Sequence, residues 1–453
     1  MSSDINIIFD LAEKALHIAQ QAGADEVEVF GLTGRGVHVD IQMDKVDLAK
    51  ESHTQGLGIK AVVNGAVGFS STNDPDRLND AVQSAVSSAR VRDSDPDWKG
   101  LPNVSEYAPV AGIHDPKVTE MDIDTCIDLA LMMVDGAASV NDAVPTAGRF
   151  SCSGSGYLIL NSNGMEMVEH TSRIDGMLDC RAGEDSEIST AYEFDISRNL
   201  DIDFYHIGRE AARQAVASVG GVKVDSGETD ILLKPAAIAE LLESTLLPSL
   251  SAESVQKGRS SMIGKLGRKI GADGLDIIDD GMLEGGIGSA RSDDEGTPSR
   301  TNCIIEDGVL GTYLYDTYTA GKDGVDSTAS AVRNNYAMTT TIDVRNLMIQ
   351  YPASDIVADT RRGVLVGSVI GAHTANPISG DFSVEARNSF VMEDGEIKSP
   401  IKSMMVSGNM FQLLQNITGA GHDVRCLGNI ITPTVKVSGL FVVGHCTKIQ
   451  LFQ

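Results

Sequence analysis

Residues 229–250, TDILLKPAAIAELLESTLLPSL, constrain the fold more than any other part of this chain. Their first apolar run, DILL, is typical of a buried strand, and Pro235 follows at a position that suits the first turn of a helix. The amphipathic pattern after this proline predicts that the strand leads directly into a helix. Such a junction commonly carries a metal ligand or a nucleophile. Here the helix contains no histidine or cysteine and offers only Glu240, Glu243 and Ser244.

The size and composition of the chain indicate a soluble globular protein. Its 453 residues are enough for two or three domains, and 42% hydrophobic with 22% charged residues is an ordinary balance. The longest apolar runs, such as VLVGSVI at residues 364–370, are far shorter than the ~20 residues of a membrane-spanning helix. The N-terminal segment is acidic and amphipathic and does not resemble a secretory signal. We therefore expect a cytoplasmic protein.

The charge of the chain argues against two classes of partner. Aspartate and glutamate number 64 against 36 lysines and arginines, which gives a formal net charge of −28. Nucleic acids and anionic membranes are bound by basic surfaces, and no stretch of this sequence supplies one. We expect neither partner. Salt adaptation and simple solubility both account for such an acidic excess.

The patterns of apolar residues and turn residues divide the chain into parts. An amphipathic helix over residues 4–22 precedes a β-rich block, and Asn-Gly pairs at 64–65 and 163–164 predict hairpins. A Pro- and Asp-rich stretch interrupts the pattern. We predict an N-terminal α+β domain at residues 1–92, a linker at 93–116, a middle α+β region at 117–225 and a β-rich C-terminal domain at 226–453. The predicted fold class is α+β, mixed in the first half and predominantly β in the second.

Several segments of the second half resemble a known family. They are DEGTP at 294–298, IIEDGVLGTYLYD at 304–316, YTAGKDGVDSTASAVR at 318–333, GDFSV at 380–384 with GEI at 395–397, and MMVSGNMFQLLQNI at 404–417. In order and spacing these segments resemble the TldD/PmbA peptidase family, and the resemblance covers nearly the whole chain. It implies a C-terminal domain of the TldD/PmbA type.

The opening segment resembles the one that carries the zinc-binding HExxxH motif in the TldD branch of this family. Glu243 and Pro248 stand where the two histidines would be, and Ser244 stands where the glutamate would be. The segments GDFSV and GEI are more similar to the TldE/PmbA branch, which lacks the zinc site. The resemblance therefore implies a chain without catalytic residues or a cofactor of its own.

The resemblance also implies a partner and a substrate. A TldE-like chain pairs with a TldD-like catalytic subunit that holds the zinc, and the pair acts on unfolded or small peptides. A β-rich wall suits an extended peptide, because main-chain pairing tolerates many side chains. The residues that we expect to contribute to a substrate chamber are Asp293, Glu295, Lys322, Arg333, Asp381 and Ser383.

Two alternatives from other classes remain open. One is a self-sufficient hydrolase working as a homodimer. It requires either a serine-type site or a metal at His422 and Cys426, whose imidazole and thiolate suit zinc. His445 and Cys446 follow near the C-terminus, but free cysteines in such a chain are more often small buried apolar residues. The other alternative is a peptide-binding scaffold without catalysis.

Overall fold

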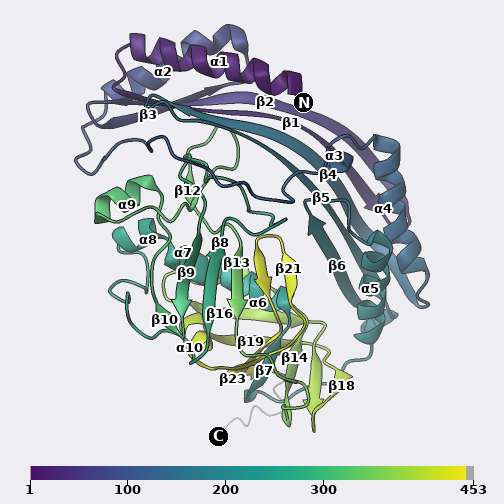
Figure 1. Ribbon diagram of the computed structural model, residues 1–453. Helices are drawn as coiled ribbons and strands as arrows, with labels where there is room; N and C mark the ends of the chain where they lie inside the picture. Colours follow the sequence, from purple (N-terminus) through teal and green to yellow (C-terminus); the bar gives the residue numbers. More distant parts are fainter. Residues whose placement is uncertain (1, 445–453) are drawn as a thin grey trace, which may run out of the picture.

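A long curved antiparallel sheet arches over a compact C-terminal lobe in the computed structural model, which describes residues 2–444 (Figure 1). The strand order in the long sheet is β3-β2-β1-β4-β5-β6. Its strands are β1 (Glu26–Gln42), β2 (Lys45–Val63), β3 (Ala66–Thr72), β4 (Ala143–Asn161), β5 (Glu166–Ala182) and β6 (Ser189–Ser197). The predicted turns at Asn64-Gly65 and Asn163-Gly164 join β2 to β3 and β4 to β5, and Asn64, Gly65 and Gly164 have positive φ.

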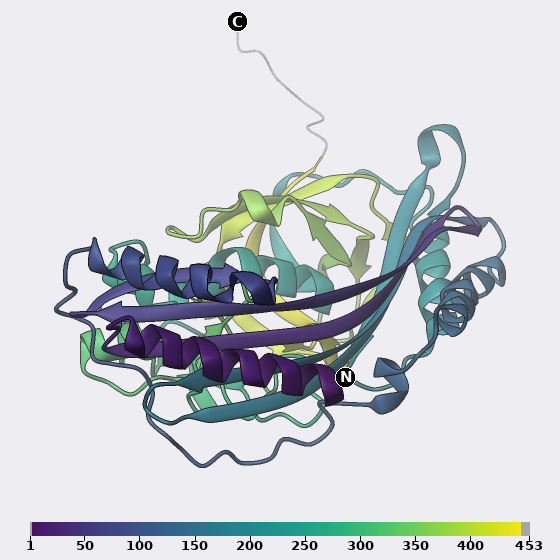
Figure 2. The ribbon, with the colours of Figure 1, turned by 90° about the horizontal axis from the view of Figure 1, so that it is seen from above.

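Helices cover the outer face of the long sheet in two groups (Figures 1 and 2). Helices α1 (Ser2–Gln21) and α2 (Leu78–Arg90) cover one end, and α4 (Ile123–Ala138) and α5 (Phe204–Ala217) cover the other. Two apolar cores lie beneath them, one centred on Val82 and Ile59 and one on Phe150 and Phe204. The predicted N-terminal and middle regions thus share one sheet, because β1 pairs with β4 in register from Glu28 to Gln42.

The predicted linker contains no long regular element. From Val91 to Asp115 the chain runs without a helix or strand, and the short helix α3 (Pro116–Thr119) follows. Its backbone is held at several points, since the Trp98 indole donates to Glu26 and the Tyr107 hydroxyl donates to the carbonyl of Gly296. The linker therefore connects the two ends of the long sheet and contacts the C-terminal lobe on the way.

The C-terminal lobe is built on two main sheets. The larger has the order β15-β16-β19-β23-β7-β14-β17-β18, with β20 paired to β23, and the smaller has the order β10-β9-β8-β13-β22-β21. The larger sheet contains β7 (Gly227–Leu233), β14 (Arg362–Val366), β15 (Ser368–Ile370), β16 (Asp381–Arg387), β17 (Phe390–Glu393), β18 (Glu396–Pro400), β19 (Met404–Asn409), β20 (Ile417–Ala420) and β23 (Val435–Val443). The smaller contains β8 (Asp276–Asp280), β9 (Thr301–Glu306), β10 (Val309–Leu310), β13 (Leu347–Gln350), β21 (Arg425–Leu427) and β22 (Ile430–Thr432). A separate pair is β11 (Ala331–Val332) with β12 (Thr341–Ile342).

One large apolar core joins these two sheets to the helices of the lobe. The helices are α6 (Pro235–Leu241), a π-helical turn (Leu242–Leu246), α7 (Leu247–Leu250), α8 (Ala252–Gln256), α9 (Thr317–Asp323) and α10 (Met410–Gln415). The predicted strand-to-helix junction is present, with Pro235 in the first turn of α6. Helix α9 lies where the Gly, Asp, Ser and Thr residues of the segment 318–333 favour a loop. It forms because Asp316 and Thr319 make a reciprocal capping box and Gly324 ends the helix at φ 69°.

The predicted fold class is confirmed: the protein is a mixed α/β molecule with a β-rich C-terminal lobe. Within residues 2–444 no helix is both long enough and apolar enough to cross a membrane.

Candidate functional site

The helix after β7 keeps an irregular turn at the motif positions. Residues Leu242–Leu246 form a π-helical turn, and the hydroxyl of Thr245 donates to the carbonyl of Leu241. Single π turns inside α-helices are often found at functional sites. Of the three motif positions, Glu243 is exposed, while Ser244 and Pro248 are half-buried.

The acidic side chains of this helix have neutral or acidic neighbours. Tyr192 donates from its hydroxyl to Glu240 at 3.2 Å. Partial burial raises the pKa of Glu240, and the neighbouring Glu243 charge adds to this effect. The Glu243 side chain reaches solvent, yet the protein packed around it and the charge of Asp343 raise its pKa as well. Glu243 forms no ion pair with a cation among the residues that the structure describes.

The predicted metal-binding pair lies beside this helix. Cys426 is exposed on β21, a strand that packs against α6, and His422 is exposed in the preceding loop. Although Cys426 reaches solvent, the protein packed around its thiol and the charge of Asp195 raise its pKa, which disfavours the thiolate that zinc needs. Among the residues that the structure describes, no three histidine, cysteine, aspartate or glutamate side chains gather as a metal site. His445 and Cys446 lie outside the described residues.

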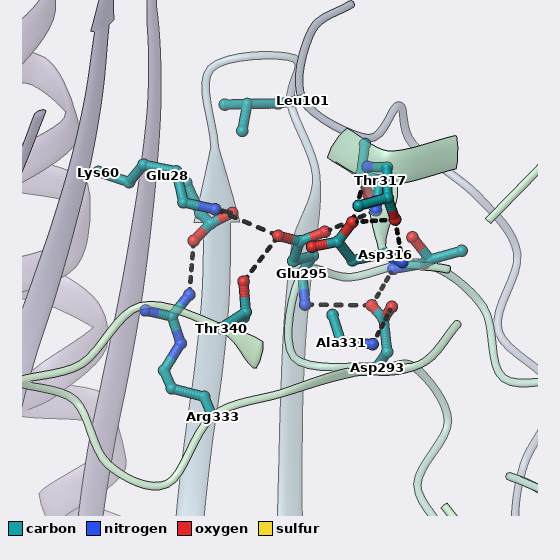
Figure 3. Close-up of polar contacts among 12 residues, drawn as sticks. Glu28, Lys60, Leu101, Asp293, Glu295, Asp316, Thr317, Ala331, Arg333 and Thr340 are labelled. Carbon is teal, nitrogen blue, oxygen red and sulfur yellow. Dashed lines mark hydrogen bonds and ion pairs between the residues drawn. The ribbon is translucent and has the colours of Figure 1, made fainter. Parts of the chain in front are cut away.

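A buried ionic network joins the long sheet to the C-terminal lobe (Figure 3). Glu28 on β1 accepts from Arg333 at 2.7 Å and from Lys60 on β2 at 3.0 Å. Lys60 also lies 3.5 Å from Glu295, and Thr340 donates to that carboxylate at 2.8 Å. Burial opposes the charge of Lys60, but Glu28 and Glu295 raise its pKa, so it stays a cation.

The loop that carries Glu295 is held by a second carboxylate. Asp293 is fully buried and accepts backbone N–H groups from Glu295, Thr297 and Ala331 at 3.1, 2.9 and 3.2 Å. Burial and the nearby charge of Glu295 raise the pKa of Asp293 to about 8. Gly296 completes the turn at φ 87°, a conformation that favours glycine.

The structure thus brings together three of the six residues predicted for a substrate chamber. Asp293, Glu295 and Arg333 lie in or beside the buried network: Asp293 accepts the backbone N–H of Glu295, and Arg333 pairs with Glu28. Lys322 on α9 is exposed and pairs with Asp97 of the linker at 3.1 Å. The other two lie on β16: Asp381 bonds to Ser379 and Asn409, and Ser383 is exposed. A substrate role for these residues stays a prediction.

Glu28 and Lys60 were not among the predicted site residues. Each lies inside an apolar stretch, VEVF and GIKAVV respectively, where a charged side chain has no solvent to face. A charge in such a run indicates a buried partner. Which partner it has depends on how β1 and β2 meet the lobe, and only the tertiary structure shows this.

Above the lobe, a cleft of about 480 Å³ opens against the inner face of the long sheet, and we call it the inner cleft. The sheet contributes residues from β1, β4, β5 and β6, including Phe30, Tyr157, Arg173 and Arg198. The lobe contributes residues 287–290, 332–335, 343–345 and 428–429 together with Asp294. Residues 428 and 429, which line the cleft, join β21 to β22, and both strands contact α6, so the motif helix lies close to the cleft.

Comparison with known proteins assigns the chain to a family. Models of the PmbA/TldA metallopeptidase family match residues 27–89 as domain 1, residues 116–219 as the central domain and residues 226–444 as the C-terminal domain. This chain belongs to the PmbA/TldD metallopeptidase family. The family assignment predicted from the spacing of the motifs is confirmed.

Individual members of the PmbA/TldD family match over almost their full length. An uncharacterized protein of Methanocaldococcus jannaschii is 32% identical over 94% of this chain and 98% of its own. The metalloprotease PmbA homolog of Haemophilus influenzae is 24% identical over 95% of each chain. The crystal structure of TldE from Thermococcus kodakarensis superimposes with a TM-score of 0.88 at 24% identity, covering 96% of this chain and 100% of that one. The likeness to TldE shows the shared fold.

Proposed function

We propose that this chain is the non-catalytic subunit, of the TldE/PmbA type, in a two-subunit zinc metallopeptidase of the cytoplasm. The observation that carries the proposal is the strand–helix frame of β7, α6, the π-helical turn and α7, which is intact while the motif side chains are Glu243, Ser244 and Pro248. A catalytic zinc site needs three protein ligands and an open position. Proline offers no ligand atom, so these residues do not fit a zinc ion.

The partner in this proposal is a TldD-like chain that holds the zinc, and the substrate is an unfolded or small peptide. This chain contributes a wall of the chamber in which the peptide lies. The inner cleft supports this role, since it is bordered by strands of the long sheet and lies close to the motif helix. A chamber wall made from strands favours extended peptides of varied sequence.

The test is recovery of the partner. An affinity-tagged copy of this chain, purified from the native extract, is expected to carry a TldD-like chain with an HExxxH motif in stoichiometric amount. The reassembled pair is expected to cleave an unstructured peptide, and a chelator abolishes this activity until zinc is restored. The proposal fails if the isolated chain, after chelation and zinc repletion, cleaves the peptide as fast as the pair.

A self-sufficient homodimeric hydrolase is the second candidate, because β21 places Cys426 on a strand that packs against α6. It predicts stoichiometric zinc in the isolated chain, lost on Cys426→Ala and retained on Cys303→Ala, a second exposed cysteine. Measurement of bound zinc in the isolated chain, in Cys426→Ala and in Cys303→Ala distinguishes this candidate from the proposal. Recovery of the chain with neither a partner nor zinc leaves the third reading, a peptide-binding scaffold.

A further inference from the structure

Two arginines face the inner cleft without a carboxylate partner. Of the arginines that line it, Arg173 pairs with Asp175 and Arg333 pairs with Glu28, whereas Arg198 and Arg345 form no ion pair within 4.0 Å among residues 2–444. The charges of Asp294 and Asp343 act on Arg345, and that of Glu169 acts on Arg198, but none of these carboxylates forms an ion pair with the arginine on which it acts. Both guanidinium groups therefore keep N–H donors that a bound anion can accept.

Arg345 is buried, with 7% of its surface exposed. Its Nε donates to the carbonyl of Gly288 at 2.8 Å, and this bond orients the guanidinium. Its Nη1 and Nη2 atoms make no hydrogen bond with any residue that the structure describes. A guanidinium presents its donors as a fixed fork that matches a carboxylate, so Arg345 offers the cleft the free part of that fork.

Arg198 reaches the same cleft from the end of β6. Its side chain donates only to backbone carbonyls, those of Ser172 at 3.1 Å, Gly286 at 3.4 Å and Ile287. These neutral acceptors hold the side chain, and the charge of Glu169 acts on it without forming an ion pair. Burial lowers the pKa of Arg198 to about 10, and the like charge of Arg345 acts in the same direction. A bound anion relieves the repulsion between the two cations.

We propose that the inner cleft binds a carboxylate group of an extended peptide, with Arg345 as the principal carboxylate-binding residue and Arg198 as the second. This inference rests on the proposed peptide-handling function. Asp294 and Asp343 also line the cleft, so a singly charged carboxylate suits it better than a doubly charged phosphate. The volume of about 480 Å³ lies within the range of small-ligand pockets and suits a short segment of peptide.

The test is calorimetric titration of the full-length chain with three pentapeptides. The first is acetyl-Ala-Ala-Val-Ala-Ala with a free C-terminal carboxylate, the second is its C-terminal amide, and the third is the amide with the central valine replaced by aspartate. A charge-assisted pair is expected to make the first or the third bind about tenfold or more tightly than the second. Tighter binding of the first peptide identifies the bound group as a C-terminal carboxylate, and tighter binding of the third identifies it as an acidic side chain.

Variants locate the site. Arg345→Gln and Arg198→Gln are each expected to remove the preference for the carboxylate, and Arg362→Gln, at an exposed arginine away from the inner cleft, is expected to leave it unchanged. If Arg345→Gln does not fold, the inference is still tested by comparing the binding of the three peptides to the unmodified chain with their binding to Arg198→Gln. Equal binding of all three peptides, or a preference that survives both substitutions, overturns the inference.

Two further outcomes are informative. Tighter binding of inorganic phosphate than of the carboxylate peptides, with loss in Arg345→Gln, overturns the choice of a carboxylate. Because the titration uses this chain alone, its result does not depend on recovery of a TldD-like partner. Failure of the pull-down with carboxylate binding intact therefore rejects the two-subunit function, whereas the reverse result rejects only this binding site.

Discussion

At the scale of single residues, the interface between the long sheet and the C-terminal lobe depends on buried charges that satisfy one another. Glu28, Lys60, Glu295 and Arg333 alternate in sign, and each touches at least one opposite charge. Buried ion pairs add little net stability compared with apolar packing, but removal of one member leaves its partner uncompensated. The network therefore fixes how the two parts dock.

Lys60→Met tests this network. This substitution removes the cation that pairs with Glu295 and one of the two cations that pair with Glu28. Because the carboxylates stay buried without full compensation, we expect the free energy of unfolding to fall by about 3–5 kcal/mol. The urea midpoint measures the change. The matched control is Lys322→Met, which removes the exposed pair with Asp97 and is expected to cost about 0–1 kcal/mol. Equal midpoint shifts for the two variants contradict the assignment.

Asp279 predicts a dependence of stability on pH. It is fully buried, its Oδ1 accepts the backbone N–H groups of Arg345 and Asn346, and its Oδ2 has no hydrogen bond. Burial raises its pKa from 3.8 to about 6. The folded state thus holds a proton that the unfolded state releases. The resulting stabilisation is complete below pH 3.8 and is lost as the pH rises through 6.

Asp279→Asn removes this titration while keeping the Oδ1 acceptor. Between pH 4 and pH 7 the native chain is expected to lose about 2 kcal/mol more stability than the variant. Urea unfolding at the two pH values measures the difference, and Asp44→Asn, an exposed aspartate in the turn between β1 and β2, serves as the control. If the stability of the native chain and that of Asp279→Asn change equally with pH, the assignment of this titration to Asp279 is wrong.

At the scale of elements, close backbone contact sets the packing of α4 on α5. A Cβ atom at Gly208 would lie 1.7 Å from the carbonyl oxygen of Met133, and one at Gly136 would lie 2.0 Å from that of Tyr205. The two glycines thus let the helices meet through their backbones. Each is required for the contact, because no side-chain movement relieves a clash with a carbonyl.

Gly208→Ala is expected to push α4 and α5 apart and to destabilise the fold by about 3 kcal/mol, at the upper end of ordinary overpacking. The thermal midpoint and the hydrogen exchange of α4 and α5 measure the effect. Gly227→Ala is the control, since a Cβ there meets no atom within 4 Å and its φ is not positive. A midpoint unchanged in Gly208→Ala would falsify the close contact.

At the scale of the whole molecule, segments far apart in the chain complete a single sheet. The strands β1 and β4 pair over fifteen residues from Glu28 to Gln42, on either side of the linker. The predicted N-terminal and middle regions therefore depend on each other for their central strand pair. The linker must be long enough to connect the two regions, but the pairing of β1 with β4, more than the unbroken linker, holds them together.

A cleavage experiment tests that dependence. A protease site inserted after Val104, in the exposed part of the linker, is expected to yield two fragments that remain associated, because the β1–β4 ladder and the buried network hold them. Gel filtration of the cut protein measures the association. Separation of the fragments without denaturant means that the linker itself maintains the fold.

The limits of prediction follow from the distance between partners along the chain. The Asn-Gly turns, the β7–α6 junction and the family were predictable, because each depends on residues close in sequence or on the order of motifs. Helix α9 was not predictable from composition, because the Gly, Asp, Ser and Thr residues of 318–333 favour a loop, whereas the capping box of Asp316 and Thr319 starts a helix there. Arg198 and Arg345 stand far apart in sequence, and neither shows a local signal of a shared site.

The sequence by itself determined the Asn-Gly turns, the strand-to-helix junction at Pro235, the acidic character and the absence of histidines from the motif helix, since all of these follow from local patterns and residue identity. Tertiary structure alone decided that β1 and β4 share a sheet, that Glu28 and Arg333 meet, and that two unpaired arginines face one cleft. The physical reason is that burial and charge compensation depend on which surfaces pack together. Each residue's neighbours in space, more than its neighbours in the chain, set its energy.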